Sequence, residues 1–240
     1  LLYVTGVQTC ALPILRARMP GSSSHRPLPR CVVFDLDGTL IDSRPAMLSA
    51  LAAQLQSEGR APVPAQALGE ALHHGLPAML ERAYALGGEV PAALDARIVS
   101  VRERYLTEAR CSAVCFEGAE ALLGALQARG CWLGLCSNQD ALSVHALLHA
   151  RGLQAHFDAV LGGDSLATRK PDPAPLRWLQ QRAGVGPEDC LLVGDSELDA
   201  ECAARSGSAC IIMAHGYGGE IRAPHRRVES FAELAELFSL

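Results

Sequence analysis

The chain has 240 residues, of which 49% are hydrophobic, so it can bury a sizeable core as one domain or as a core with an insertion. Its formal net charge of -5 leaves no basic stripe to neutralise phosphates, which argues against nucleic acid as the main partner. No apolar run approaches the ~20 residues that a membrane-spanning helix needs. We therefore expect a globular protein that binds neither nucleic acid nor membranes.

Residues 1–29 do not match the pattern of the rest of the chain. Residues 4–14, VTGVQTCALPI, resemble the in-frame translation of a common sequencing adapter. No positively charged region or small-x-small cleavage site marks the segment as a signal peptide. We expect residues 1–29 to be a non-native or disordered leader, with Met19 as the native start.

A short apolar run at residues 31–34, CVVF, predicts a buried strand. Asp35 and Asp37 follow it, together with Gly38, which can adopt a turn that would strain other residues. Open α/β sheets bind ligands just outside the carboxyl ends of their strands, so this position favours a functional site. An acidic surface turn is the alternative interpretation of D-x-D-G taken alone.

A helical block follows this strand. Residues 45–58 carry apolar residues at helical spacing, with Pro45 in the first turn and Gly59 as the stop. Residues 65–110 predict three helices, broken at residues 75–77 and 87–88, and show no strand pattern. An all-helical block between two α/β stretches predicts an inserted cap, with bounds at residues 44–110.

Strands and helices alternate from Phe116 onward, which predicts βαβ units and a parallel sheet. The expected helices are residues 117–129, 141–151, 173–183 and 197–205, and the expected strands are residues 131–136, 157–161, 190–193 and 209–213. A capping box at Ser230 and Glu233 predicts a last helix ending at Phe238. The predicted fold class is α/β: a Rossmann-like parallel sheet with helices on both faces, formed by residues 30–43 and 111–240, with the helical cap inserted.

The nine cysteines form no C-x-x-C pair, and five of them lie in or beside the predicted strands. Reduced cysteines are used in this way, as small apolar residues, in cytosolic interiors. We therefore expect a cytoplasmic protein whose cysteines bind no metal.

Polar residues follow several of the predicted strands, and a parallel sheet would bring them to one edge. They are Asp35, Asp37, Ser137, Asn138, Asp195 and Asp199, with Lys170 just before a predicted helix. Three or four carboxylates repel one another unless a cation lies between them, and oxygen ligands suit Mg²⁺. A hydroxyl, backbone amides and one lysine suit a transferring phosphoryl group. One carboxylate can attack phosphorus to form an aspartyl-phosphate, and another can serve as general acid and base.

The four motifs DLDGTL, CSN, KP and GDSELD, in this order, resemble those of the haloacid dehalogenase superfamily of phosphatases over residues 31–240. Within that superfamily, VLGGDSLATRKPDPAPL, VGDSELDAECAARSG, HGYGGE and SFAEL are similar to phosphoglycolate phosphatases. The resemblance implies a nucleophile, Asp35; a general acid and base, Asp37; phosphate-binding residues, Ser137, Asn138 and Lys170; and Mg²⁺ ligands, Asp35, the Asp37 carbonyl and Asp195, with Asp199 in support.

The resemblance implies a Mg²⁺-dependent phosphatase that acts on a small phosphorylated metabolite, first of all 2-phosphoglycolate, as a monomer or homodimer. The alternatives are a sugar-phosphate phosphatase, for instance on amino-sugar 6-phosphates, a β-phosphoglucomutase-like enzyme, and a catalytically silent scaffold. In the cap, Arg82 is the candidate for binding a substrate carboxylate, because its fork of donors suits one. His73 and His74 are expected to be solvated residues near a helix end, with contact to the substrate as the alternative.

Overall fold

The computed structural model describes residues 28–240, so the adapter-like stretch, Met19 and most of the predicted leader lie outside the described residues. Leu28 and Pro29, the last two residues of that leader, contact the core. Leu28 packs against the main hydrophobic cluster, and the Pro29 carbonyl accepts a hydrogen bond from the Cys131 thiol, with an O–S distance of 3.2 Å.

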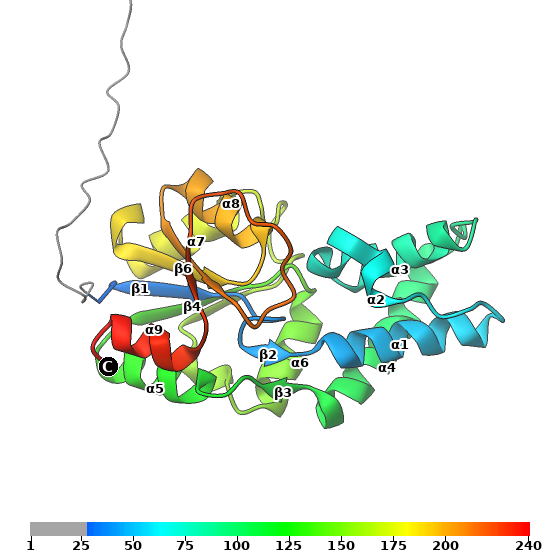
Figure 1. The fold of residues 1–240 in the computed structure, drawn as a ribbon, viewed down its shortest axis with the longest axis horizontal. Coiled ribbons are helices and arrows are strands. Elements are labelled where there is room, and N and C mark those ends of the chain that lie inside the picture. Colours follow the sequence, from blue (N-terminus) through cyan, green and yellow to red (C-terminus); the bar gives the residue numbers. More distant parts are fainter. Residues whose placement is uncertain (1–27) are drawn as a thin grey trace, which may run out of the picture.

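Six strands form one parallel sheet in the order β5-β4-β1-β6-β7-β8 (Figure 1). They are β1 (Cys31–Phe34), β4 (Trp132–Cys136), β5 (Ala159–Leu161), β6 (Cys190–Gly194), β7 (Ala209–Met213) and β8 (Arg226–Val228). The strand order reverses beside β1, which is the position where open α/β sheets bind ligands. The predicted parallel sheet is confirmed. Strand β8 was not predicted, because two of its three residues are exposed arginines without an apolar pattern.

Helices cover both faces of the sheet, because successive residues of a strand point to opposite sides. Val32 and Phe34 belong to the larger hydrophobic cluster, and Cys31 and Val33 to the smaller one. The smaller cluster packs under α7 (Ala174–Ala183) and α8 (Glu197–Ser206). The larger cluster packs under α5 (Ala119–Ala128), α6 (Ala141–Ala150) and α9 (Phe231–Leu237). Figure 1 shows α7 and α8 on one face of the sheet and α5 and α9 on the other. The Rossmann-like core is therefore as predicted.

The smaller cluster contains five of the cysteines: Cys31, Cys136, Cys190, Cys202 and Cys210. All cysteines among the described residues are free thiols. On β1 and β6, the Cys31 and Cys190 sulfurs lie 3.8 Å apart, as neighbours in register. The cysteines therefore fill the space between the sheet and two helices as small apolar side chains.

The helical cap lies to one side of the sheet (Figure 1). It consists of α1 (Arg44–Ser57), α2 (Ala65–Leu68), the 3₁₀ helix η1 (Gly69–His74), α3 (Leu76–Leu86) and α4 (Leu94–Ser112). Helix α4 continues two residues past the boundary predicted at residue 110, so this boundary falls inside a helix. No helix within residues 28–240 is long and apolar enough to cross a membrane.

Two short strands connect the cap to the core. β2 (Ile41–Asp42) pairs antiparallel with β3 (Val114–Cys115). The segment that leads from the core into the cap therefore lies beside the segment that leads back. These strands were not predicted, because two residues are too few for an alternating pattern.

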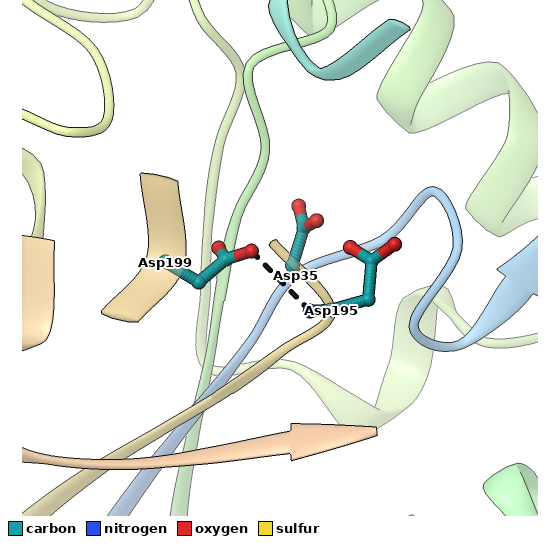
Figure 2. Close-up of side chains that lie close together, drawn as sticks. All are labelled: Asp35, Asp195 and Asp199. Carbon is teal, nitrogen blue, oxygen red and sulfur yellow. Dashed lines mark hydrogen bonds between the residues drawn. The ribbon is translucent and has the colours of Figure 1, made fainter. Parts of the chain in front are cut away.

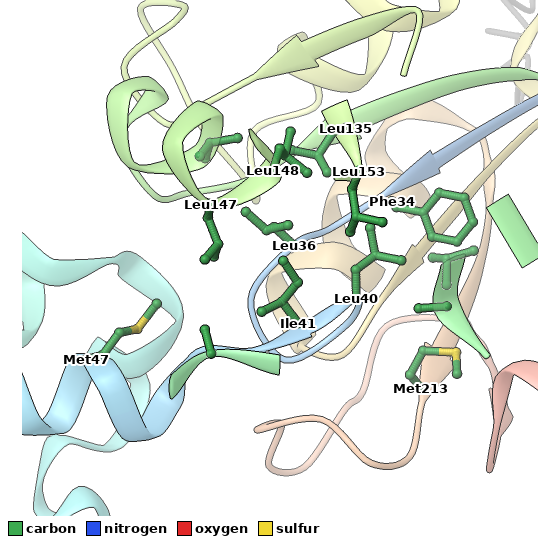
Figure 3. Close-up of a cluster of buried hydrophobic side chains, with 14 of the residues drawn as sticks. Phe34, Leu36, Leu40, Ile41, Met47, Leu135, Leu147, Leu148, Leu153 and Met213 are labelled. Atoms are coloured by element: carbon green, nitrogen blue, oxygen red, sulfur yellow. The ribbon is translucent and has the colours of Figure 1, made fainter. Parts of the chain in front are cut away.

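One hydrophobic cluster extends from the sheet into the cap. It includes Phe34 on β1, Leu135 on β4, Leu36 just after β1, Ile41 on β2 and Met47 on α1 (Figure 3). All five side chains are buried. The first cap helix is thereby packed against the segment that follows Asp35.

Candidate active site

The polar residues singled out in the sequence lie at the ends of three neighbouring strands. Asp35 follows β1, Ser137 follows β4, and Asp195 follows β6. Because β1 pairs in parallel with both β4 and β6, all three residues emerge at the same edge of the sheet. The Asp35 backbone N–H donates to the Val193 carbonyl at 2.8 Å, which fixes Asp35 against the neighbouring strand.

Lys170 lies between two buried carboxylates. Its Nζ is 2.8 Å from Asp35 Oδ1 and 2.6 Å from Asp199 Oδ1. Burial alone lowers the pKa of Lys170, but the charges of Asp199 and Asp35 outweigh it and hold the pKa well above its ordinary value. Lys170 is therefore a fixed positive charge that orients both carboxylates.

Asp195 adds a third carboxylate. One oxygen each of Asp35, Asp195 and Asp199 lie within 4.8 Å of one another, and Figure 2 shows the three side chains close together. The backbone N–H of Tyr217 donates to Asp195 Oδ2 at 2.6 Å. Asp195 Oδ1 is buried and has no hydrogen-bond partner among the described residues. Leaving such an oxygen unpaired is costly, and a hard cation such as Mg²⁺ fits it.

Asp199 uses both of its oxygens within the protein. Oδ1 contacts Lys170, and Oδ2 accepts hydrogen bonds from the Ser196 hydroxyl at 2.6 Å, the Ser196 N–H at 3.1 Å and the Asp195 N–H at 3.3 Å. Ser196 and Asp199 form the capping box that starts α8. Asp199 therefore holds Lys170 and the Asp195 backbone in place, rather than offering a free oxygen to a cation.

Asp37 lies across the turn from Asp35. Its Oδ1 accepts a hydrogen bond from the Ser43 hydroxyl at 2.5 Å, and its Oδ2 lies 3.5 Å from the Ser137 hydroxyl. Gly38 forms the turn with a φ of 84°, and a Cβ at this position would lie 2.4 Å from an Asp195 oxygen. The turn conformation and the nearby carboxylate both require glycine here.

Burial raises the pKa of these acidic groups. It is the largest cause in each case, raising the pKa of Asp35 to about 7, that of Asp37 to about 6 and that of Asp195 well above its ordinary value. Lys170 acts against this rise at Asp35, and the Ser43 hydrogen bond acts against it at Asp37, whereas neighbouring carboxylates add to it at Asp195. Four carboxylates around one lysine leave excess negative charge, and a divalent cation would neutralise it.

The side-chain amide of Asn138 connects the Lys170 segment of the core with the cap. Its Nδ2 donates to the Lys170 carbonyl at 3.0 Å and to the His73 carbonyl of the cap at 3.2 Å. Beside it, the Ser137 hydroxyl accepts from the Gln139 N–H at 3.0 Å. A Cβ at Gly163 would lie 2.3 Å from the Asn138 carbonyl oxygen, so the loop after β5 packs directly on this segment.

The loop containing HGYGGE packs over Asp195, a role that its sequence did not predict. A Cβ at Gly216 would lie 2.1 Å from the Asp195 Cβ, and a Cβ at Gly218 would lie 2.1 Å from the Asp195 carbonyl oxygen. Tyr217, between these glycines, supplies the N–H that binds Asp195 Oδ2. The glycines on either side of a tyrosine were the available signal for this close approach.

A small pocket between core and cap contains most of these groups. Its core residues are Asp35, Asp37, Ser137, Asn138, Gln139, Lys170, Ser196 and Leu198, and its cap residues are Met47, Leu72, His73 and Gly75. Asp195 and Asp199 lie next to it, in the carboxylate cluster.

Arg82, the predicted cap residue, is not brought into this pocket. It is exposed, and its Nε donates to the Ala67 carbonyl at 3.4 Å. The inner face of α3 consists of apolar residues such as Met79 and Ala83, so the helix turns Arg82 outward. His73, expected to be a solvated residue, lines the pocket instead.

The arrangement has the parts that phosphoryl transfer requires. Asp35 is a carboxylate fixed by Lys170, Asp37 is a second carboxyl group with a pKa in a range useful for proton transfer, and Asp195 presents a free oxygen. Groups that could act as a nucleophile, as a proton donor and as a ligand of a cation are thus gathered at the strand ends.

Comparison with known proteins agrees with this geometry. The model of a haloacid dehalogenase-like hydrolase family matches residues 29–207. A phosphoglycolate phosphatase of Rhodospirillum rubrum is 38% identical over 216 residues, 88% of this chain and 90% of the relative. A crystal structure of a predicted phosphoglycolate phosphatase from Haemophilus somnus is 25% identical, with a TM-score of 0.78 over 90% of this chain and 99% of that one. The phosphate complex of CbbY from Rhodobacter sphaeroides shares the fold, with 21% identity and a TM-score of 0.77 over 89% of this chain and 100% of that one. The chain therefore belongs to the haloacid dehalogenase-like hydrolase family.

Proposed function

We propose that this enzyme is a Mg²⁺-dependent phosphatase that hydrolyses a small phosphate monoester, with 2-phosphoglycolate as the first candidate, through an aspartyl-phosphate on Asp35. The observation that carries the proposal is the pair of contacts from Lys170 to Asp35 and Asp199, next to an Asp195 oxygen without a partner. A merely structural salt bridge would not need this unpaired third carboxylate.

Asp35 and Asp37 divide the chemistry between them. An Asp35 carboxylate oxygen attacks phosphorus, and the bond to the leaving alcohol oxygen breaks as Asp37 gives that oxygen its proton. Water then attacks the aspartyl-phosphate and gives a proton to Asp37, which releases phosphate and regenerates both side chains. A pKa of about 6 suits Asp37 for both roles, because the group can hold or release a proton near neutral pH.

The surrounding residues stabilise the charge of the phosphoryl group. Lys170 presents its ammonium group beside Asp35, and the Ser137 hydroxyl and neighbouring backbone N–H groups are candidate donors to the phosphoryl oxygens. Asn138 binds the Lys170 carbonyl and so fixes the position of this lysine. We assign phosphate binding to Ser137, Asn138 and Lys170.

The residues that would hold Mg²⁺ are Asp35, the backbone carbonyl of Asp37, and Asp195, with Asp199 holding them in place. When bound, the ion would neutralise phosphoryl oxygens and lower the pKa of the buried carboxyl groups. The partnerless Asp195 oxygen and the excess of carboxylates support this assignment.

The substrate assignment is supported by the relatives. The R. rubrum protein is named a phosphoglycolate phosphatase, and so is a Xylella fastidiosa protein 36% identical over 81% of this chain and 84% of the relative. The pocket between core and cap is small, which suits a short substrate. A cytoplasmic location and a monomeric or dimeric state stay predictions.

A panel of phosphate esters with Mg²⁺ or EDTA tests the proposal. We expect hydrolysis of 2-phosphoglycolate that EDTA abolishes, and no turnover by the Asp35→Asn variant, which keeps the shape but loses the nucleophile. Appreciable activity of Asp35→Asn at the same Mg²⁺ concentration would rule out the covalent mechanism. Preference for an amino-sugar 6-phosphate would change the substrate assignment and leave the proposed chemistry at Asp35 unchanged.

A further inference from the structure

The cap supplies one polar side chain to the pocket. Of the cap residues that line it, Met47 and Leu72 are apolar and Gly75 has no side chain, which leaves His73 as the one with hydrogen-bond donors. The core residues of the pocket, by contrast, include Lys170 and the groups assigned to the phosphoryl end of the substrate. The part of a substrate that extends away from phosphorus toward the cap therefore meets His73.

The backbone on either side of His73 is bound to the core. The His73 carbonyl accepts from Asn138 Nδ2 at 3.2 Å, the His74 carbonyl accepts from Arg169 Nη1 at 3.4 Å, and the Leu76 N–H donates to Gln139 Oε1 at 3.4 Å. These bonds use the backbone of the cap segment, so they persist when the His73 side chain is changed. The backbone that carries His73 is thereby held at a defined place beside the pocket.

The imidazole itself is available for a ligand. Within residues 28–240 its ring nitrogens have no hydrogen-bond partner, although His73 is partly buried. Burial lowers the pKa of His73, with Asp199 and Glu70 acting against it and His74 and Lys170 adding to it. A neutral imidazole keeps one N–H donor, so hydrogen bonding to an anion does not depend on protonation.

We infer that His73 is a specificity residue that donates a hydrogen bond to a carboxylate at the end of the substrate away from the phosphoryl group. This inference rests on the proposed function, because it takes the phosphoryl end to lie at Asp35. The arginines that could compete lie elsewhere: Arg82 is exposed and bonded to a carbonyl, and the Arg44 guanidinium stacks 4.6 Å from the centre of the Tyr217 ring, outside the pocket lining.

The test compares two unreactive phosphonates of equal length in the presence of Mg²⁺. One is 3-phosphonopropionate, which replaces the ester oxygen of phosphoglycolate by a methylene group, and the other is propylphosphonate, which lacks the carboxylate. Dissociation constants are measured by calorimetry for the wild-type enzyme and for His73→Leu, His73→Gln and His74→Leu. His74 is the matched control, because it is the adjacent histidine and does not line the pocket.

We expect the wild-type enzyme to bind 3-phosphonopropionate about tenfold or more tightly than propylphosphonate, because the carboxylate gains a donor in a partly dry site. His73→Leu should bring this ratio close to one by weakening 3-phosphonopropionate alone. His73→Gln, which keeps a donor, should retain part of the ratio, and His74→Leu should retain all of it.

A ratio near one in the wild-type enzyme, or an unchanged ratio in His73→Leu, would overturn the inference. Turnover of p-nitrophenyl phosphate by the same proteins distinguishes a failure of the proposed function from a failure of the inference about His73. A wild-type enzyme that hydrolyses no phosphate ester contradicts the proposed function, whereas an active enzyme with an unchanged phosphonate ratio contradicts only the role of His73.

Discussion

The hydroxyl of Tyr217 accepts a hydrogen bond from the backbone N–H of Ser43 at 2.7 Å, across 174 residues of sequence. It also accepts from the Arg44 N–H at 2.8 Å, at the start of α1. The Ser43 hydroxyl in turn donates to Asp37, and the Tyr217 backbone N–H donates to Asp195. One tyrosine thus connects the proposed acid and base, the proposed metal ligand and the first helix of the cap.

Replacing Tyr217 by phenylalanine should lower kcat and leave Mg²⁺ activation nearly unchanged. The variant loses the acceptor for Ser43 and Arg44, which loosens the residue that orients Asp37 and lowers the free energy of unfolding by ~1–3 kcal/mol. The backbone N–H that holds Asp195 remains. The measurement is kcat against Mg²⁺ concentration for each protein.

Tyr84→Phe is the control for this variant, because it removes a hydrogen bond from the Tyr84 hydroxyl to Glu58, 2.9 Å long and confined to the cap. It should lose stability without the fall in kcat. Equal kcat values for the two variants, or a shift in Mg²⁺ activation for Tyr217→Phe alone, would contradict the assigned role.

Asp37→Asn should separate the two chemical steps. The amide cannot accept the proton from water, so phosphoryl groups transferred to Asp35 should persist on the protein. With p-nitrophenyl phosphate, whose leaving group needs little protonation, we expect slow turnover and a mass increase of one phosphoryl group in protein quenched with acid. Normal steady-state turnover by this variant would remove Asp37 from the mechanism.

The metal-free protein should become less stable as pH rises from about 5 to 8. Each carboxyl group with a folded-state pKa above its unfolded value of about 4 contributes stability that is present at low pH. This contribution is lost as pH rises through the folded pKa, about 6 for Asp37 and about 7 for Asp35. In EDTA, Tm should therefore fall over this range, and Mg²⁺ should raise Tm more at pH 8 than at pH 5.

Asp195→Asn tests, in the same experiment, whether the carboxylate cluster causes this loss of stability. The amide keeps the size of the side chain and an oxygen for the Tyr217 N–H, while removing one buried negative charge. The variant should have a higher Tm than wild type in EDTA at pH 8, a flatter dependence of Tm on pH, and little gain from Mg²⁺. A Tm in EDTA below that of wild type at pH 8 would show that the cluster is not under electrostatic strain.

Gly163→Ala should disturb the active site from outside the pocket. The added methyl group would lie 2.3 Å from the Asn138 carbonyl oxygen and 2.8 Å from its carbon, so the backbone that carries the proposed phosphate-binding residues must move. We expect a loss of stability of ~1–3 kcal/mol and a fall in kcat/KM. Urea unfolding and steady-state kinetics measure the two effects.

Gly124→Ala provides the opposite case, because Gly124 lies within α5 and an added Cβ meets nothing within 4 Å. Alanine favours a helix over glycine by ~1 kcal/mol, so this variant should be more stable and equally active. If Gly163→Ala behaved like Gly124→Ala, the loop after β5 would not position Asn138.

The core architecture was predictable because its signals are local. The run at residues 31–34, the alternation after Phe116 and the rule that parallel strands end at one edge were enough to place Asp35, Ser137 and Asp195 together. The helical character of the cap followed in the same way, from the periodicity of α1 and the glycine breaks on either side of α3.

Tertiary structure alone decided which polar side chain of the cap lines the pocket and how the carboxylates share their partners. The chemistry of Arg82 made it the better candidate from sequence, yet the apolar residues of α3 occupy the inner face and turn it to solvent, while η1 carries His73 over the pocket. The bonds of Tyr217 to Ser43 and Asp195 join residues far apart in sequence, and no local periodicity encodes them. Local patterns fix elements and their ends; the orientation of side chains between elements depends on packing over the whole chain.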